Sequence, residues 1–197
     1  MGTMIINKKK IIIDKNVIIS FQKGEMWAFK AIYTDISPFI YNIVLKMMKS
    51  PEETEDLTHD IFIKIYNNSK KFNHSVKFTT WAYRIAVNYT LNHIKRKKVL
   101  LTKLSELFFH WDNGHNNEDP IEKLDIKEKV HHILSKIKPE FRICLILREF
   151  ESQSYHDIAD ILNIGLGTVK SRINRGKVEF LKVYKTLVGG NIHDQNN

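Results

Sequence analysis

The 197-residue sequence holds very little cysteine and no long apolar run. Cys144 is its single cysteine, so the chain can form neither an internal disulfide nor a cysteine-rich zinc site. No stretch approaches the roughly 18 apolar residues that a membrane-spanning helix needs. The apolar run from Ile11 to Ile13 is cut by Asp14 and Lys15, which makes it too short for a signal peptide. These absences favour a cytoplasmic protein without membrane insertion.

The motifs of common catalytic and metal sites are also missing. The sequence contains no glycine-rich phosphate loop, no HExxH pattern and no Ser-His-Asp order. Its nine histidines are scattered, and the adjacent pair His131 and His132 points to different faces of a helix. The sequence therefore predicts no enzymatic activity, no cofactor and no metal site.

The chain is basic, with a formal net charge of +9. A balance of this sign favours nucleic acid or another polyanion as a partner, although it carries no information about the fold. The hydrophobic fraction of 43% is sufficient for a packed core. The length suits one domain or two small ones.

The most informative stretch runs from Ser154 to Lys182. Ser154 is a good helix cap, because its short side chain can bond free backbone N–H groups. Asn163 and Gly165 then end that first helix, since both tolerate left-handed backbone angles. A second helix follows, and its inward stripe repeats at spacings of four, three and four residues: Val169, Ile173, Gly176 and Phe180. Its opposite face is polar and basic, so the pair predicts a helix-turn-helix whose second helix enters a DNA major groove.

Upstream of this motif, the sequence predicts mostly helix from about residue 14 to residue 98. A serine cap with proline at the first helical position, Ser50-Pro51, marks one clear helix start. That helix opens with acidic residues, which favour its dipole. A polar loop precedes a further helix, which starts near residue 79 and ends in four consecutive basic residues, 95–98.

Residues 99–119 have a different character, an apolar half followed by a polar half rich in asparagine. We interpret them as a flexible linker between two helical domains, with an apolar half that docks elsewhere. Helices are expected again from Asp119-Pro120 and from Pro139, and the second of these is nearly all apolar and buries Cys144. The expected fold class is all-α, with two small helical domains, the C-terminal one carrying the helix-turn-helix.

Three segments together resemble bacterial sigma factors of the extracytoplasmic-function (ECF) class: EDLTHDIFIKIY (55–66), KFTTWAYRIAVNYTLNHIKRKK (77–98) and residues 154–182. The resemblance implies a subunit that binds core RNA polymerase, recognises promoter DNA and promotes its melting, with an anti-sigma factor as a further partner. It divides the chain into an N-terminal arm (1–13), a region 2-like domain (14–98), a linker (99–119), a region 4-like domain (120–187) and a disordered tail (188–197).

The same resemblance assigns three sets of site residues. The face that docks on the polymerase comprises Asp56, His59 and Asp60. The minus-ten element is read by a loop and the helix that follows it, at Phe72, Phe78, Thr79, Thr80, Arg84, Asn88, Asn92 and Lys95. The minus-thirty-five element is read by the second helix of the helix-turn-helix, at Thr168, Lys170, Ser171, Arg172, Asn174 and Arg175. Gly176 departs from the family, in which alanine is usual, and should weaken its helix by about 1 kcal/mol.

Two other functions are compatible with parts of this pattern. One is a stand-alone helix-turn-helix regulator that binds duplex DNA without polymerase. A simple regulator would not need the acidic helix 51–66, the Asn88 and Asn92 face or the aromatic linker. The other is a nucleic-acid enzyme such as a recombinase with a helix-turn-helix tail, for which the sequence offers no evident nucleophile.

Overall fold

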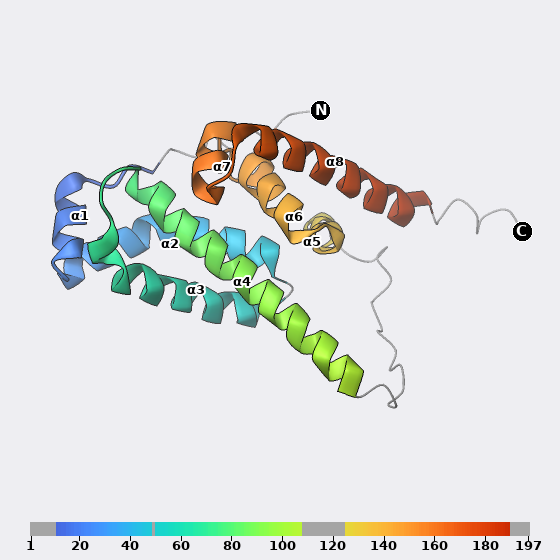
Figure 1. The fold of residues 1–197 in the computed structure, drawn as a ribbon, viewed down its shortest axis with the longest axis horizontal. Coiled ribbons are helices and arrows are strands. Elements are labelled where there is room, and N and C mark those ends of the chain that lie inside the picture. Colours follow the sequence, from blue (N-terminus) through green and yellow to red (C-terminus); the bar gives the residue numbers. More distant parts are fainter. Residues whose placement is uncertain (1–10, 49, 108–124, 190–197) are drawn as a thin grey trace, which may run out of the picture.

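The computed structural model describes residues 11–48, 50–107 and 125–189, and all regular structure in these ranges is helical (Figure 1). The N-terminal unit comprises α1 (Lys15–Gln22), α2 (Met26–Met47), α3 (Pro51–Asn67), the 3-10 turn η1 (Ser69–Lys71) and α4 (Phe78–Leu107). The C-terminal unit comprises α5 (Ile126–Lys136), α6 (Pro139–Leu145), the π-helical turn η3 (Ile146–Phe150), α7 (Tyr155–Leu162) and α8 (Leu166–Gly189). The all-α prediction is confirmed. Among the described helices, none has the length and apolar character that a bilayer crossing requires.

Side-chain caps set several helix starts. The Ser50 hydroxyl accepts from the backbone N–H of Glu53 at 3.3 Å, with Pro51 at the first position of α3. The predicted start at Asp119-Pro120 lies outside the described residues. α5 begins instead with a capping box, in which Asp125 and Glu128 bond each other's backbone N–H groups. The sequence pattern had not singled out this second cap.

The helix-turn-helix forms as its residue pattern predicts. Ser154 caps α7 by accepting from the N–H of Asp157 at 3.1 Å. Asn163 ends α7 in the left-handed region, with φ of 53° and ψ of 50°, which an asparagine tolerates better than most residues with a Cβ. Val169 and Ile173 of α8 are buried. α8 thus presents its opposite face to solvent.

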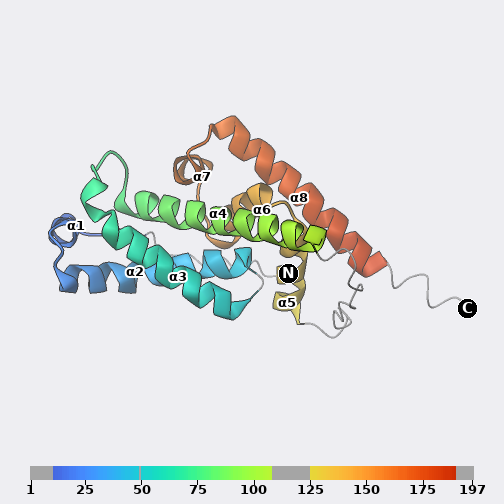
Figure 2. The ribbon, with the colours of Figure 1, turned by 60° about the horizontal axis from the view of Figure 1, so that its bottom comes forward.

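The two units pack against each other (Figures 1 and 2). α2 crosses the N-terminal unit, and its last turn meets α5 and α6, while α7 lies along the first half of α4. Buried apolar side chains of the described residues form one continuous cluster that includes Ile40 and Ile43 of α2 and Ile146 and Ile158 of the C-terminal unit. The two predicted domains therefore share a core in this arrangement.

Helix α4 is longer than the sequence suggested. The sequence predicts an end near Lys98, but the helix runs to Leu107 because residues 99–107 contain neither glycine nor proline to stop it. The first part of the predicted linker is thus helical, and its exposed side chains include Val99, Leu100 and Leu101. Linker residues 108–119 lie outside the described residues, as do 1–10 of the predicted arm. α8 reaches Gly189, two residues into the predicted tail, and the rest of that tail is also outside the described residues.

Candidate nucleic-acid and polymerase interface

The predicted minus-thirty-five residues lie along the outer face of α8. Thr168, Lys170, Ser171, Asn174 and Arg175 are exposed. The Arg175 guanidinium lies 6.0 Å from the centroid of the Phe141 ring, a distance at which the ring can attract and orient the cation. Short polar and long basic side chains thus alternate on a helix face that is free to enter a DNA groove.

Arg172 differs from the other residues of this set. It is only partly exposed and lies beside the thiol of Cys144 in α6. Burial raises the pKa of Cys144 to about 11, and the nearby Arg172 partly opposes that rise. The Cys144 Sγ also lies 3.3 Å from the Glu140 carbonyl oxygen. Arg172 therefore contacts α6, the helix on which α8 packs, and also borders the outer face of α8.

Helix α8 approaches α6 unusually closely at Gly176. A Cβ at this position would lie 2.9 Å from Cγ of Leu145 and 3.3 Å from the carbonyl oxygen of Phe141. From the sequence alone, Gly176 is distinguished only by its low helix propensity. The structure gives it a packing role, because any side chain there meets α6.

The predicted polymerase-binding residues form an exposed acidic face on α3. Asp56, His59 and Asp60 all point away from the core, whereas Leu57 and Ile61 are buried. The Tyr89 hydroxyl of α4 donates to Oδ2 of Asp60 at 3.1 Å. Burial, and then this hydrogen bond, raise the pKa of Tyr89.

Basic residues of α4 border that acidic face. A surface groove of about 510 Å³ is lined by acidic residues of α3 and by basic residues of α4. Within it, Lys97 forms an ion pair with Glu53. The residues that line the groove are Glu53, Asp56, Leu57, Asp60, His93, Arg96, Lys97 and Leu100. A partner that docks on Asp56 and Asp60 therefore meets charges of both signs.

The aromatic residues of the predicted minus-ten set lie in the core. Phe72 and Phe78 are each 4% exposed, and their ring centroids are 5.3 Å apart. Trp81 completes the cluster, with its ring centroid 5.4 Å from each of them. As packed, Phe72 and Phe78 hold the 73–77 loop against α4 and do not face solvent. The loop itself contains His74 with φ of 61°, a left-handed conformation that the sequence did not reveal.

The α4 residues of the same set divide into two groups. Asn88, Asn92 and Lys95 are exposed in one row, at spacings of four and three residues. Thr80 is buried, and Arg84 donates from Nε at 3.1 Å to the Asp160 carbonyl oxygen of α7. The first group is therefore accessible, and the second meets the C-terminal unit.

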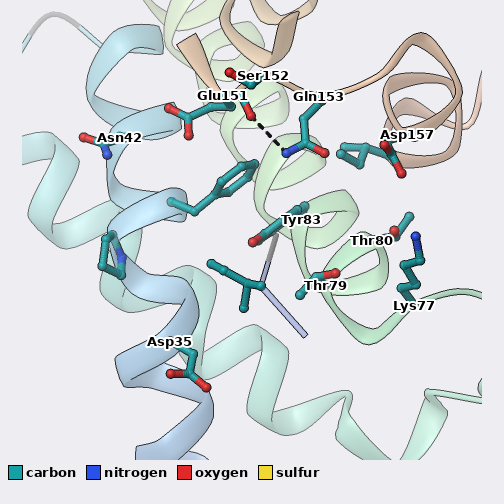
Figure 3. A pocket seen from close by; sticks show the side chains of 14 residues that line it. Asp35, Asn42, Lys77, Thr79, Thr80, Tyr83, Glu151, Ser152, Gln153 and Asp157 are labelled. Carbon is teal, nitrogen blue, oxygen red and sulfur yellow. Dashed lines mark hydrogen bonds between the residues drawn. The ribbon is translucent and has the colours of Figure 1, made fainter. Parts of the chain in front are cut away.

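The junction beside Thr79 and Thr80 is hollowed. Figure 3 shows a pocket of about 400 Å³ between α2, the start of α4 and the loop that precedes α7. Its polar lining residues are Asp35, Asn42, Lys77, Thr79, Thr80, Tyr83, Glu151, Ser152, Gln153 and Asp157. Burial, with the negative charge of Glu151, raises the pKa of Tyr83. No local sequence signal could have predicted this pocket, because its walls come from segments far apart in the chain.

Family models match both units of the chain. The model of sigma-70 region 2 matches residues 32–99, and that of sigma-70 region 4 matches residues 127–180. ECF RNA polymerase sigma factor SigW of Bacillus subtilis (strain 168) is 31% identical over 88% of this chain and 97% of its own length. RNA polymerase sigma-H factor of Pseudomonas aeruginosa (strain PAO1) is 28% identical over 89% of this chain and 95% of its own.

Two solved structures share the fold. CnrH, in complex with the cytosolic domain of CnrY, has a TM-score of 0.66 and 15% identity, over 88% of this chain and 97% of that one. RpoE from Bartonella quintana, in complex with the anti-sigma factor NepR, has a TM-score of 0.62 and 20% identity, over 82% of this chain and 96% of that one. The chain belongs to the ECF class of RNA polymerase sigma factors, the subunits that give the polymerase its promoter specificity. The comparisons lend no support to a stand-alone regulator.

Proposed function

We propose that this sigma factor reads the minus-thirty-five element as closed duplex through the outer face of α8. Lys170 and Arg175 supply charge for phosphates and donors for guanine edges, and Asn174 is suited to adenine. The observation that carries the proposal is the exposure of these side chains on a helix whose other face is buried against α6. Arg172, which is partly buried, contributes by supporting this face.

The minus-ten element is contacted by the exposed row of Asn88, Asn92 and Lys95. Asparagine amides can bond the edge of a base that has left the stack, and lysine can neutralise the adjacent backbone. The Phe72 and Phe78 cluster gives the neighbouring loop a rigid base. Thr79, Thr80 and Arg84 join this surface only when the C-terminal unit moves away, since these residues now lie at the junction with α7 and its preceding loop.

The acidic face of α3 docks on a basic surface of core RNA polymerase. Asp56 and Asp60 supply the negative charge, and His59 lies between them on the same exposed side. Charge complementarity of this kind accelerates association and fixes orientation. The chain acts in the cytoplasm and has no enzymatic activity of its own. An anti-sigma protein regulates it, as the complex of RpoE with NepR illustrates for a structural relative.

Run-off transcription tests the proposal directly. Core polymerase is incubated with genomic fragments, with and without this chain, and the start sites are mapped. The chain should produce new start sites, and the variant in which Lys170 and Arg175 are both alanine should lose most of them. A matched control replaces Lys182, an exposed lysine further along α8 and outside the proposed contact set, with alanine. An unchanged pattern of start sites on adding the wild-type chain would contradict the proposal.

A further inference from the structure

The C-terminal end of α2 is held by side chains of the C-terminal unit. The last carbonyl groups of a helix have no donor within the helix. Nε2 of His131 in α5 lies 2.9 Å from the Leu45 carbonyl oxygen and 2.6 Å from that of Met48. Because both partners are acceptors, Nε2 must carry the hydrogen in this arrangement. A residue from one unit thus caps a helix of the other.

Arg142 of α6 strengthens the same contact. Its Nη1 donates to the Met47 carbonyl oxygen at 2.9 Å. Its Nη2 donates to the carbonyl oxygens of Ser135 and Ile137, also at 2.9 Å, so the guanidinium is anchored in its own unit. Burial lowers the pKa of Arg142, yet a cation at the negative end of α2 is favoured by the helix dipole. The guanidinium therefore bridges the two units.

A second point of contact lies along α4. Arg84 donates to the Asp160 carbonyl oxygen of α7, as described above. Elsewhere at the junction, Nζ of Lys46 in the last turn of α2 lies 3.8 Å from Oε1 of Glu151 and 5.3 Å from the centroid of the Phe150 ring. The closed arrangement thus occupies part of the proposed minus-ten surface. The outer face of α8 and the row that begins at Asn88 stay exposed.

In this compact arrangement the chain cannot reach both promoter elements at once. This inference rests on the proposed function. The minus-ten and minus-thirty-five elements lie about 25 base pairs apart, which is about 85 Å of duplex at about 3.4 Å per base pair. A compact chain of about 200 residues has a radius of gyration of about 16 Å, and hence a diameter on the order of 40 Å. The units must therefore separate for simultaneous contact.

We propose that His131, Arg142 and Arg84 form an interdomain latch that holds the free chain closed and is released before both promoter elements are bound. Closure is carried by residues of this chain and needs no partner protein. The latch itself consists largely of bonds to backbone carbonyl groups, beside the buried apolar core that the two units share. When it opens, water satisfies those carbonyls, so each bond adds only a modest net stability to the closed state. A partner with higher affinity for the open state can therefore shift the population.

Pulsed electron resonance distances between the two units test the latch in the full chain. Spin labels are attached at Lys70→Cys in η1 and Lys182→Cys in α8, both at exposed positions. Cys144 is buried and its pKa is about 11, so the native thiol is spared at neutral pH. The free wild-type chain should show one short distance, and the complex with core polymerase and promoter DNA a distance tens of ångströms longer. A broad distribution in the free chain would overturn the latch.

Variants of His131 isolate the contribution of the latch. His131→Ala should raise the open population by about fivefold, the change expected when one hydrogen bond is lost. His131→Gln keeps a side-chain donor and should restore closure. His132→Ala is the matched control, because the neighbouring side chain faces a different side of α5. Arg142 is left intact, since two of its acceptors lie within the C-terminal unit.

Two results separate failure of the latch from failure of the proposed function. If His131→Ala and His132→Ala give the same distances as the wild type, the latch is wrong, whatever the transcription result. If the labelled chain redirects run-off transcription while its units stay close together, the latch is again wrong and the proposed function stands. If the chain forms no initiating complex with core polymerase, the proposed function fails, and the distances in the free chain still report on closure.

Discussion

Replacing Gly176 with alanine should destabilise the C-terminal unit, although alanine is the better helix former. Helix propensity alone predicts a gain of about 1 kcal/mol in the free energy of unfolding. The new Cβ, however, would lie 2.9 Å and 3.0 Å from two carbons of Leu145 and 3.3 Å from the Phe141 carbonyl oxygen. Leu145 is 4% exposed, and the backbone of α6 has little room to move. Overpacking of this kind costs about 1–3 kcal/mol. Subtracting the gain of about 1 kcal/mol from helix propensity leaves an expected net loss of up to about 2 kcal/mol.

Gly167→Ala provides the matched control on the same helix. Apart from its chain neighbours and the backbone of its own helix, no atom of the described residues lies within 4 Å of a Cβ built at Gly167, so this substitution should be neutral or stabilise by up to about 1 kcal/mol. Thermal unfolding followed by circular dichroism measures both variants. For a chain of this size, 1 kcal/mol corresponds to about 2–4 °C in Tm. Equal gains in Tm for the two variants would refute the argument that α6 and α8 are too close for a side chain.

Three further predictions concern the site and the core. Asp56→Lys combined with Asp60→Lys should abolish binding to core polymerase in a pull-down while the melting curve is retained; unchanged affinity would remove α3 from the interface. Lys170→Ala should weaken initial promoter binding and, if the lysine contacts a phosphate, should reduce the slope of log affinity against log salt concentration by about one. Asn88→Ala should leave promoter binding in a filter assay intact but slow strand opening, as detected by permanganate footprinting. A shared defect at one step would contradict this division. Because folding raises the pKa of Cys144 from 9.0 to about 11, its contribution to stability is present below pH 9 and is lost as the pH rises towards 11. Alkylation at neutral pH should accordingly require denaturant, and rapid labelling of the native chain would show that the thiol is accessible.

Local signals in the sequence predicted the helices and the turn well. Ser50 and Ser154 act as caps, and Asn163 takes the left-handed conformation, because each depends on residues within one turn of itself. The exposed row of α4 and the outer face of α8 also follow from helical periodicity. Spacing within a single helix is sufficient to place side chains on one face.

Features that depend on contact between distant segments could not be predicted. The sequence around Gly176 indicates only its low helix propensity. The contact that requires a glycine is made by α6, about thirty residues earlier in the sequence. By position, Phe72 and Phe78 match a DNA-contacting loop. Their size and apolarity also suit a core, and both side chains are buried in the structure. His131 appeared as one of several scattered histidines, because the α2 carbonyls that it bonds are more than eighty residues away.

The hydrogen bond between Tyr89 and Asp60 has a consequence for the proposed docking of the acidic face of α3 on polymerase. A free surface carboxylate samples several rotamers, and a partner that fixes one of them loses binding free energy to the lost side-chain entropy. Here Oδ2 of Asp60 is already held by the Tyr89 hydroxyl, whose ring lies 5.2 Å from Nζ of Lys64. An immobilised side chain costs about 0.5–1.5 kcal/mol at an interface. Because folding already meets part of that cost, the acidic face is preorganised for the proposed contact. Tyr89, which holds Asp60, lies on the same helix as the residues proposed to capture the melted base.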